Sequence, residues 1–281
     1  MVFALLGLAA CGASTGGAGG PSATSPAPLT APAQPSAGAV FSWPNGVGAA
    51  VSLTYDDAIP TDVDVAAPAL DRHHLHGTFF LTGTSAELGK RPDAWRAIAR
   101  AGHELASHTM FHPCDRSHDF VKKGYALEDY DVDRMRRELD ESIALLRSLG
   151  ADHGPYTFAY PCGTTWIGEN HTSYVPLAEQ VFLAARGVGS TIADPRTEPL
   201  GNIPGIGGDG KTGDELIALV RAAAARSGWL VLLFHGVGGD YLTVDAASHD
   251  QLLAYLDANR QTVWTDTFGA VARHVAAARG R

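Results

Sequence analysis

Two carboxylates and two histidines in this sequence have the residue types and spacing of a metal site. Asp56 and Asp57 follow an apolar run at 49–54, and adjacent carboxylates after a buried strand need a positive charge nearby. A divalent metal would supply that charge; a solvated turn with a helix-capping aspartate is the alternative. His108 and His112 lie four residues apart and would face one ion if their loop forms a single helical turn. Because the chain has 12 histidines, a chance pair is the alternative here.

These groups could divide the work of a hydrolysis. One aspartate and two histidines leave coordination positions for water and for a substrate carbonyl, and the second carboxylate could take a proton from that water. His235 follows the apolar run 229–234 and precedes Gly236, which leaves room for a substrate. His235 could protonate the leaving group, or it could be a structural histidine with satisfied hydrogen bonds.

Strand-like and helix-like segments alternate along the chain and would position these residues. Strands are expected at 49–54, 77–81, 103–107, 157–160 and 229–234, and helices at 62–74, 93–101, 131–149, 214–226, 251–259 and 268–278. Uninterrupted apolar strands separated by helices predict a parallel α/β fold with helices covering the sheet. The polar residues follow the strands, and in parallel barrels the carboxyl ends of the strands build the active site.

The N-terminal region differs in composition from the rest. Residues 1–11 read as a secretory signal that ends in a lipobox-like Leu-Ala-Ala-Cys, so Cys11 would be lipidated. Since no Lys or Arg precedes Cys11, a plain apolar stub is the alternative. Residues 12–38 are rich in Gly, Ala, Ser, Thr and Pro and should be a disordered linker. Residues 39–281 are expected to form a single catalytic domain.

Charge and hydropathy exclude some partners. A formal net charge of -9 argues against nucleic-acid binding, and the apolar run 2–10 is too short to span a bilayer. We expect an exported monomer, either secreted or held at the cell envelope through a lipid on Cys11 alone. A neutral substrate such as a polysaccharide fits this charge, but so do many others.

Four short segments carry most of the reactive residues. They are Thr54–Asp57, Ser107–His112, Phe158–Gly163 and Leu233–His235. In this order they resemble four motifs of the polysaccharide deacetylase family (carbohydrate esterase family 4, with the NodB homology domain). The first motif usually reads Thr-Phe-Asp-Asp, the second His-Ser/Thr-x-x-x-His and the last Leu-x-His, and the resemblance spans roughly residues 51–275.

The resemblance implies a fold and a set of roles. The fold would be a distorted (β/α) barrel of the NodB type in a single domain. Asp57, His108 and His112 would bind a divalent metal, expected to be Zn²⁺ with Co²⁺, Mn²⁺ or Ni²⁺ as alternatives, while Asp56 would be the general base and His235 the general acid. The backbone N–H of Cys162 would help to hold the oxyanion, and Tyr160 and Pro161 would line the substrate site.

The sequence departs from the family pattern at three places. Ala159 stands where many members have an arginine that braces the catalytic aspartate, and Arg186 is the candidate replacement. Cys162 stands where an aromatic residue usually follows proline. The fourth motif is not recognisable, so Asp194 and Asp266 are the candidates for orienting His235.

The cysteines suggest a covalent link beside the site. In the implied fold, the loops that carry Cys114 and Cys162 flank one pocket, and a disulfide between them would suit an oxidising, exported setting. Two unpaired thiols or an additional metal ligand are the alternatives.

The expected function is metal-dependent hydrolysis of acetyl groups on a glycan through a metal-bound water, without a covalent acyl-enzyme. The glycan would be an N-acetylglucosamine polymer or an O-acetylated polysaccharide. One alternative is a carboxylesterase for acetyl-xylan or aryl esters that uses the same metal site. Another is a catalytically silent glycan-binding lipoprotein, against which the presence of all five metal and acid–base residues argues.

Overall fold

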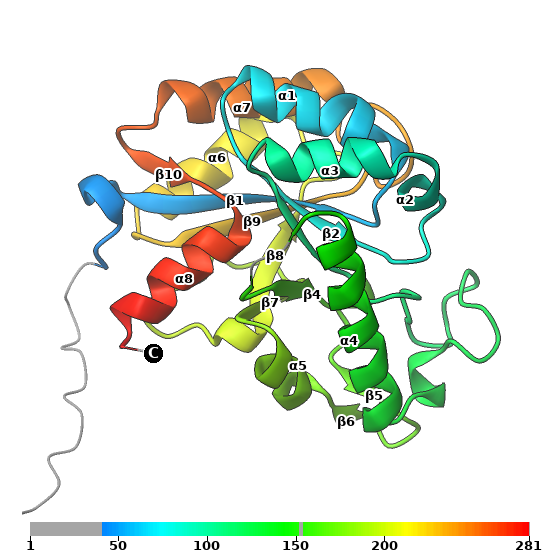
Figure 1. Cartoon of the computed structure of the whole chain (residues 1–281). Coiled ribbons are helices and arrows are strands. Elements are labelled where there is room, and N and C mark those ends of the chain that lie inside the picture. The colour runs from blue at the N-terminus through cyan, green and yellow to red at the C-terminus, as the bar shows by residue number, and fades with distance from the viewer. Residues whose placement is uncertain (1–40, 152–153, 281) are drawn as a thin grey trace, which may run out of the picture. The chain divides into compact units, whose positions relative to one another are not determined.

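Parallel strands form one sheet that closes on itself. The computed structural model describes residues 41–151 and 154–280, so the predicted signal, lipidation site and linker lie outside the described residues. In the described chain the strand order is β10-β1-β2-β3-β4-β7-β8-β9, and β1 also pairs with β9. Seven strands therefore close a parallel barrel, and β10 adds to the edge of β1 (Figure 1). The predicted barrel of this type is confirmed.

The eight-stranded sheet includes all five strands that the sequence predicted and three that it did not. The predicted strands are β1 (Ala49–Asp56), β2 (Thr78–Leu81), β3 (Glu104–Ser107), β4 (Thr157–Ala159) and β9 (Trp229–Phe234). The additional barrel strands are β7 (Ala184–Val188) and β8 (Ile203–Gly207), and β10 spans Val263–Thr265. A short hairpin, β5 (Trp166–Ile167) with β6 (Thr172–Ser173), lies outside the barrel sheet.

Strand β1 is hydrogen-bonded along both of its edges. One edge pairs with β9 from Ala50 to Tyr55. The other edge pairs first with β10, from Ala49 to Val51, and then with β2, from Thr54 to Asp56. This double pairing fixes the position of Asp56 at the carboxyl end of the strand.

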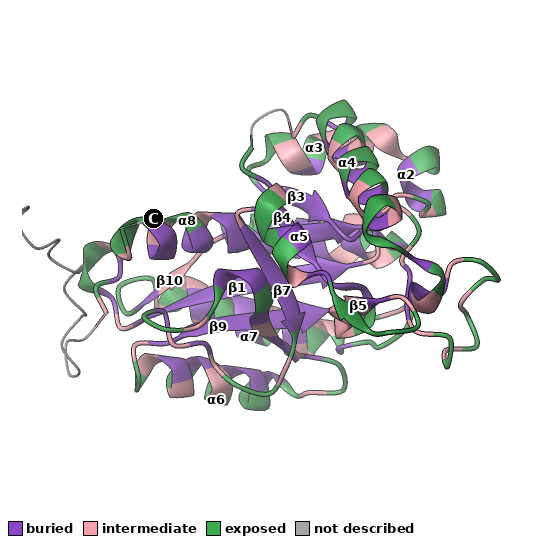
Figure 2. Ribbon diagram, turned by 90° about the horizontal axis from the view of Figure 1, so that it is seen from below, coloured by how far each residue is buried: buried purple, intermediate pink, exposed green. Residues whose placement is uncertain are grey.

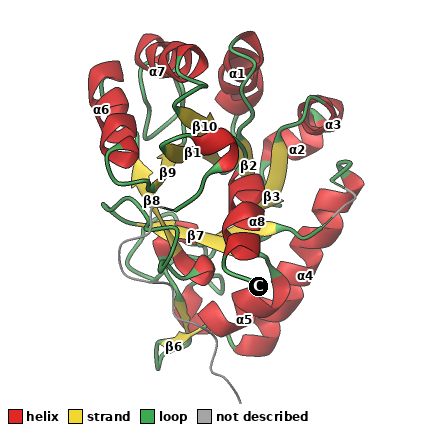
Figure 3. Ribbon diagram, turned by 90° about the vertical axis from the view of Figure 1, so that its left-hand side faces the viewer, coloured by secondary structure: helices red, strands yellow, loops and turns green. Residues whose placement is uncertain are grey.

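Helices surround the strands on the outside of the barrel (Figure 3). They are α1 (Ala67–Arg72), α2 (Ala86–Lys90), α3 (Pro92–Arg100), α4 (Val132–Ser148), α5 (Val175–Val181), α6 (Gly213–Ala224), α7 (Ala246–Ala258) and α8 (Phe268–Ala278). The sequence prediction missed α2 and α5, and it merged α1 with a π-helical turn at Asp62–Ala66. None of the described helices is long and apolar enough to cross a membrane.

Local side-chain chemistry sets where the longer helices begin. Asp131 accepts a hydrogen bond from the Arg134 backbone N–H and caps α4. Thr212 and Glu215 form a reciprocal capping box at the start of α6. Asp245 caps α7, which therefore begins five residues before the predicted start at 251. These caps satisfy N–H groups that the first turn of a helix leaves unpaired.

Side chains alternate between the inside and the outside of the barrel. Ala50, Phe80, Ala106, Ala159 and Val231 belong to one buried cluster, which fills the interior. The intervening residues of β1, such as Val51 and Leu53, belong to a second cluster beneath the surrounding helices. Figure 2 shows the strands buried and the helices exposed on their outer sides. A narrow barrel has room for few large side chains, which explains the interior alanines.

The amino ends of the strands meet at Glu104. Its carboxylate accepts hydrogen bonds from the Thr78 hydroxyl (2.8 Å), the Thr157 hydroxyl (2.7 Å) and the Gly269 backbone N–H (2.8 Å). One side chain thus joins β2, β4 and the first turn of α8. Burial raises the pKa of this carboxyl group, although the three donors oppose the shift.

We expect Glu104→Leu to lower the free energy of unfolding by about 3 kcal/mol or more, because three donors lose their acceptor in a buried place. Urea denaturation followed by circular dichroism measures the change. Glu141→Leu, on the exposed face of α4, is the matched control and should shift stability by less than about 0.5 kcal/mol. Equal effects of the two substitutions would contradict the role given to Glu104.

Candidate active site

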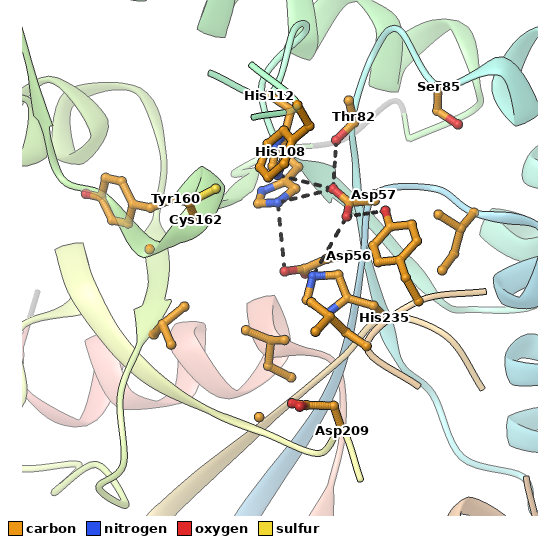
Figure 4. Close-up of a pocket in the computed structure, with 18 of the residues that line it drawn as sticks. Asp56, Asp57, Thr82, Ser85, His108, His112, Tyr160, Cys162, Asp209 and His235 are labelled. Atoms are coloured by element: carbon orange, nitrogen blue, oxygen red, sulfur yellow. Dashed lines mark hydrogen bonds and ion pairs between the residues drawn. The ribbon is translucent and has the colours of Figure 1, made fainter. Parts of the chain in front are cut away.

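Polar side chains converge at the carboxyl end of the barrel, in a pocket of about 820 Å³. Asp56 ends β1, His108 follows β3, Arg186 lies in β7 and His235 follows β9. Figure 4 shows Asp56, Asp57, His108 and His235 facing one another in this pocket. The strand ends therefore bring together residues that are far apart in the sequence.

Asp57, His108 and His112 form a triangle of metal-ligating atoms. Asp57 Oδ1 lies 3.6 Å from His108 Nε2 and 3.3 Å from His112 Nε2, and the three ligand atoms lie within 4.8 Å of one another. A tetrahedral ion with bonds of 2.0–2.1 Å holds neighbouring ligand atoms about 3.3 Å apart. The donor set of one carboxylate and two imidazoles thus fits a small divalent cation such as Zn²⁺.

The surroundings of His108 leave its Nε2 lone pair available. Its Nδ1 lies 2.8 Å from the Ala159 carbonyl oxygen and donates a hydrogen bond to it. Burial lowers the pKa of His108 to about 4, against the opposing influence of Asp56. The imidazole is therefore neutral at neutral pH, with its proton on Nδ1, which is the form that ligates metals.

His112 reaches the site through a loop, and the predicted helical turn is wrong. Thr109 (φ 63°) and His112 (φ 51°) both adopt the left-handed backbone conformation. The Thr109 hydroxyl accepts a hydrogen bond from the His112 N–H (3.0 Å), and Glu138 Oε1 accepts one from the Phe111 N–H (2.9 Å). Side chains thus take the backbone N–H groups that a helical turn would need.

Asp57 turns toward the pocket because it leaves the strand. Regular alternation would place it on the outside with Tyr55, but its φ of 81° redirects the chain, and its N–H bonds to the Phe80 carbonyl (3.0 Å). Thr82 donates to Asp57 Oδ1 (3.2 Å) and Tyr241 donates to Oδ2 (2.6 Å). Burial alone would raise the pKa of Asp57, but His108, His112, the Tyr241 hydrogen bond and His235 lower it to about 2.

Asp56 is paired with Arg186 on the opposite side of the barrel. Both side chains are almost fully buried, and the Arg186 guanidinium donates to Asp56 Oδ2. Asp56 Oδ1 is also buried, and no described residue forms a hydrogen bond with it. The carboxylate is thus neutralised through one oxygen and keeps the other free to accept a proton.

Arg186 stands one strand away from the position at which the family motif has its arginine. Strands β4 and β7 are paired so that Ala159 lies directly opposite Arg186. Both positions point into the barrel at the same height, so a guanidinium on either strand could reach Asp56. The small Ala159 side chain leaves room for the long arginine beside it.

His235 lies on the other side of Asp57, with its Nε2 3.8 Å from Asp57 Oδ2. The two aspartates proposed to orient it lie outside the pocket lining. Asp194 pairs with Arg196 (2.8 Å), and Asp266 accepts from the Trp264 indole N–H (3.2 Å). Asp209 lines the pocket with His235 instead.

The third-motif residues form the wall beside His112. Tyr160 lines the pocket, but its hydroxyl donates to the Gly201 carbonyl (2.7 Å) and is already engaged. Pro161 is buried, and Cys162 is exposed at the pocket with φ 54°. A disulfide joins Cys162 to Cys114, whose sulfur lies 3.6 Å from His112 Nδ1. The disulfide thus connects the metal-ligand loop to the predicted oxyanion loop.

Sequence reasoning missed Thr82 and Tyr241. Thr82 directly follows a predicted strand, so the rule that strand ends carry function could have identified it. Tyr241 lies in the glycine-containing loop 236–245 after His235. No local pattern connects it to Asp57, because the contact forms only when the barrel closes.

Comparisons with known proteins agree with this geometry. The sequence profile of the polysaccharide deacetylase family matches residues 45–175. A chitooligosaccharide deacetylase from Sinorhizobium fredii is 28% identical over 75% of this chain and 85% of its own length. A gellan lyase from Bacillus sp. is 26% identical over 83% of this chain, but the matched region is only 10% of that protein.

Solved structures share the fold. A Mycobacterium smegmatis protein assigned to the polysaccharide deacetylases superimposes with a TM-score of 0.58 at 22% identity, over 86% of this chain and 95% of that one. The peptidoglycan deacetylase PdaC of Bacillus subtilis gives a TM-score of 0.51 at 16% identity, over 83% and 93% of the two chains. The profile match, the barrel and the convergence of the motif residues together show that this chain belongs to the polysaccharide deacetylase family.

Proposed function

We propose that this chain is a metal-dependent hydrolase that removes acetyl groups from an N- or O-acetylated glycan. The observation that carries the proposal is the pairing of two different carboxylates. Asp57 lies within a metal-ligating triangle, and Asp56, its neighbour, has one oxygen held by Arg186 and one free. The similarity to a chitooligosaccharide deacetylase supports an acetylated sugar as substrate.

Each residue would have a distinct part in the reaction. A divalent cation on Asp57, His108 and His112 would polarise the acyl carbonyl and make an attacking water more acidic. Asp56 would accept the proton of that water on Oδ1 while Arg186 holds Oδ2. His235 would donate a proton to the departing nitrogen or oxygen. The Cys162 backbone N–H would stabilise the oxyanion.

The proposal includes export. The Cys114–Cys162 disulfide supports work in an oxidising compartment, since disulfides persist there and are rare in the cytosol. Lipidation of Cys11 stays a prediction, and mass spectrometry of the mature N-terminus in the native host would test it.

Removal of the metal should abolish acetate release. We expect the purified chain to release acetate from at least one of chitooligosaccharides, acetyl-xylan or an aryl acetate, to lose this activity after dialysis against a chelator, and to regain it when Zn²⁺ is added. The readout is an enzyme-coupled acetate assay. Full activity of verified metal-free protein would contradict the proposal.

Asp56→Asn should lower kcat by about 10²–10⁴-fold, because a general base contributes on that order, while leaving Zn²⁺ bound. Metal content by mass spectrometry and single-turnover rates separate the two effects. His108→Gln is the contrasting variant and should lose both metal and activity. Undiminished turnover by Asp56→Asn would remove Asp56 from the role of base.

The arginine should be transferable between neighbouring strands. We expect Arg186→Ala to lose at least tenfold in kcat/KM and about 3–5 kcal/mol of stability, because it leaves Asp56 as a buried charge without its partner. The double variant Ala159→Arg/Arg186→Ala returns the guanidinium to the strand that carries it in many family members. It should recover part of both losses; recovery of neither would show that Arg186 acts in some other way.

A further inference from the structure

The mouth of the pocket is apolar on three sides. Six large apolar side chains are exposed in the described chain, and four of them line this pocket: Phe120, Val188, Tyr241 and Leu242, each 49–62% exposed. They come from three separate segments, namely the loop before α4, the end of β7 and the loop after β9. Apolar residues that gather from distant segments around one pocket mark a binding surface.

Each apolar residue lies beside a different part of the reactive centre. The Phe120 ring is 6.2 Å from the His112 ring. Val188 packs so closely on Gly163, next to Cys162, that a Cβ added at Gly163 would lie 2.9 Å from Val188 Cβ. Leu242 directly follows Tyr241, which contacts Asp57. A group bound by these side chains would therefore lie next to the bond that is cleaved.

The backbone of loop 236–245 holds Leu242 in an unfavourable conformation. Leu242 (φ 44°) and Asp240 (φ 61°) both have positive φ, which is rare for a bulky residue and costs of the order of 1–3 kcal/mol. Hydrogen bonds from Gly236 N–H to the Tyr241 carbonyl (3.1 Å) and from Thr61 N–H to Asp240 Oδ2 (3.0 Å) fix the loop. Strain that places an exposed leucine at a pocket mouth indicates a function there.

Few polar groups in the lining remain for sugar hydroxyls. Besides the metal and acid–base residues, Thr82, Tyr160, Arg186 and Tyr241 line the pocket, but their side chains already form hydrogen bonds within the protein. The remaining polar side chains of the lining are Thr84, Ser85, His118 and Asp209. The Ser85 hydroxyl donates to the Ala58 carbonyl (2.6 Å). A fully polar ligand would leave many of its hydrogen-bonding groups facing Phe120, Val188 and Leu242, which is costly.

We propose that Phe120, Val188 and Leu242 form a subsite for an apolar group of the substrate, adjacent to the scissile ester or amide. This inference rests on the proposed hydrolytic function and narrows its substrate class. The apolar group could belong to the acyl side, as a chain longer than acetyl, or to the leaving side, as an aryl or alkyl aglycone. Both sources present the same chemistry to the three side chains.

Two substrate series with the Zn²⁺-loaded full chain distinguish the sources. The acyl series compares 4-nitrophenyl acetate, butanoate and hexanoate; the leaving-group series compares 4-methylphenyl and 4-butylphenyl acetate, whose phenols are similar in acidity. We expect kcat/KM to rise at least tenfold along one series, since one methylene in an apolar pocket contributes about 10–200-fold. The series that rises identifies the side of the substrate that binds.

Variants tie the effect to the subsite. Val188→Ser and Leu242→Ser should each lower that rise at least threefold. Val132→Ser, the same change at an exposed valine of α4 outside the pocket, should leave it intact. The subsite would be overturned if kcat/KM stayed constant along both series, or if the three variants had equal effects. Neither outcome would contradict metal-dependent acetate release. Absence of release from every substrate would instead overturn the proposed function.

An independent contact assigns a role to Tyr241. Its hydroxyl donates to Asp57 Oδ2 (2.6 Å), whereas Asp57 Oδ1 faces His108 and His112. We infer that Tyr241 is a positioning residue, which occupies Oδ2 so that only Oδ1 serves as the metal ligand.

Tyr241→Phe tests this role by metal affinity, without reference to turnover. Loss of an outer partner of a ligand typically weakens metal binding 10–100-fold, so the Zn²⁺ Kd, measured by competition with a chelator, should rise at least tenfold. The phenylalanine keeps the apolar ring and leaves the subsite nearly unchanged. Tyr255→Phe in α7, outside the pocket lining, is the matched control. An unchanged Zn²⁺ Kd in Tyr241→Phe would overturn the inference.

Discussion

The burial of two adjacent carboxylates is the constraint on which the site depends. Asp56 and Asp57 are both largely removed from water, and neither charge is tolerable there without a partner. Strand alternation would separate them to opposite faces of β1, but the left-handed backbone at Asp57 brings both into one pocket. The double pairing of β1 with its neighbours holds this arrangement in place.

The charges of Asp56 and Asp57 are balanced in different ways, which is the basis for the roles proposed for them. Arg186 is a permanent cation buried against Asp56, so a metal ion gains little by approaching that carboxylate. Asp57 has two hydroxyl donors, Thr82 and Tyr241, and three imidazoles around it, those of His108, His112 and His235. This difference supports the proposed roles, with a cation at Asp57 and the free oxygen of Asp56 as the proton acceptor.

The sequence predicted what depends on local pattern. Apolar strands such as 229–234 and the capped helix 132–148 were recognisable, and so were the reactive residues that follow strands. Strands β7 and β8 were missed because Ala-Ala-Arg-Gly-Val and Ile-Pro-Gly-Ile-Gly have low strand propensity. Barrel closure, not propensity, makes them strands. The helical turn predicted at His108–His112 failed because Thr109 and Glu138 side chains bind its backbone.

The absence of the motif arginine at position 159 is weak evidence that a barrel of this kind is catalytically inactive. The proposed chemistry needs a cation beside Asp56, and the register of β4 and β7 places two positions, 159 and 186, directly opposite each other, of which Arg186 reaches Asp56. Position 159 carries an alanine, which has no charge, and Arg186 on the neighbouring strand supplies the guanidinium that pairs with Asp56. A linear motif records only one of these solutions, since strands adjacent in the barrel are separated in sequence by α5 and its loops. Function in this fold is therefore better judged from the interior layer of the barrel than from the motif alone.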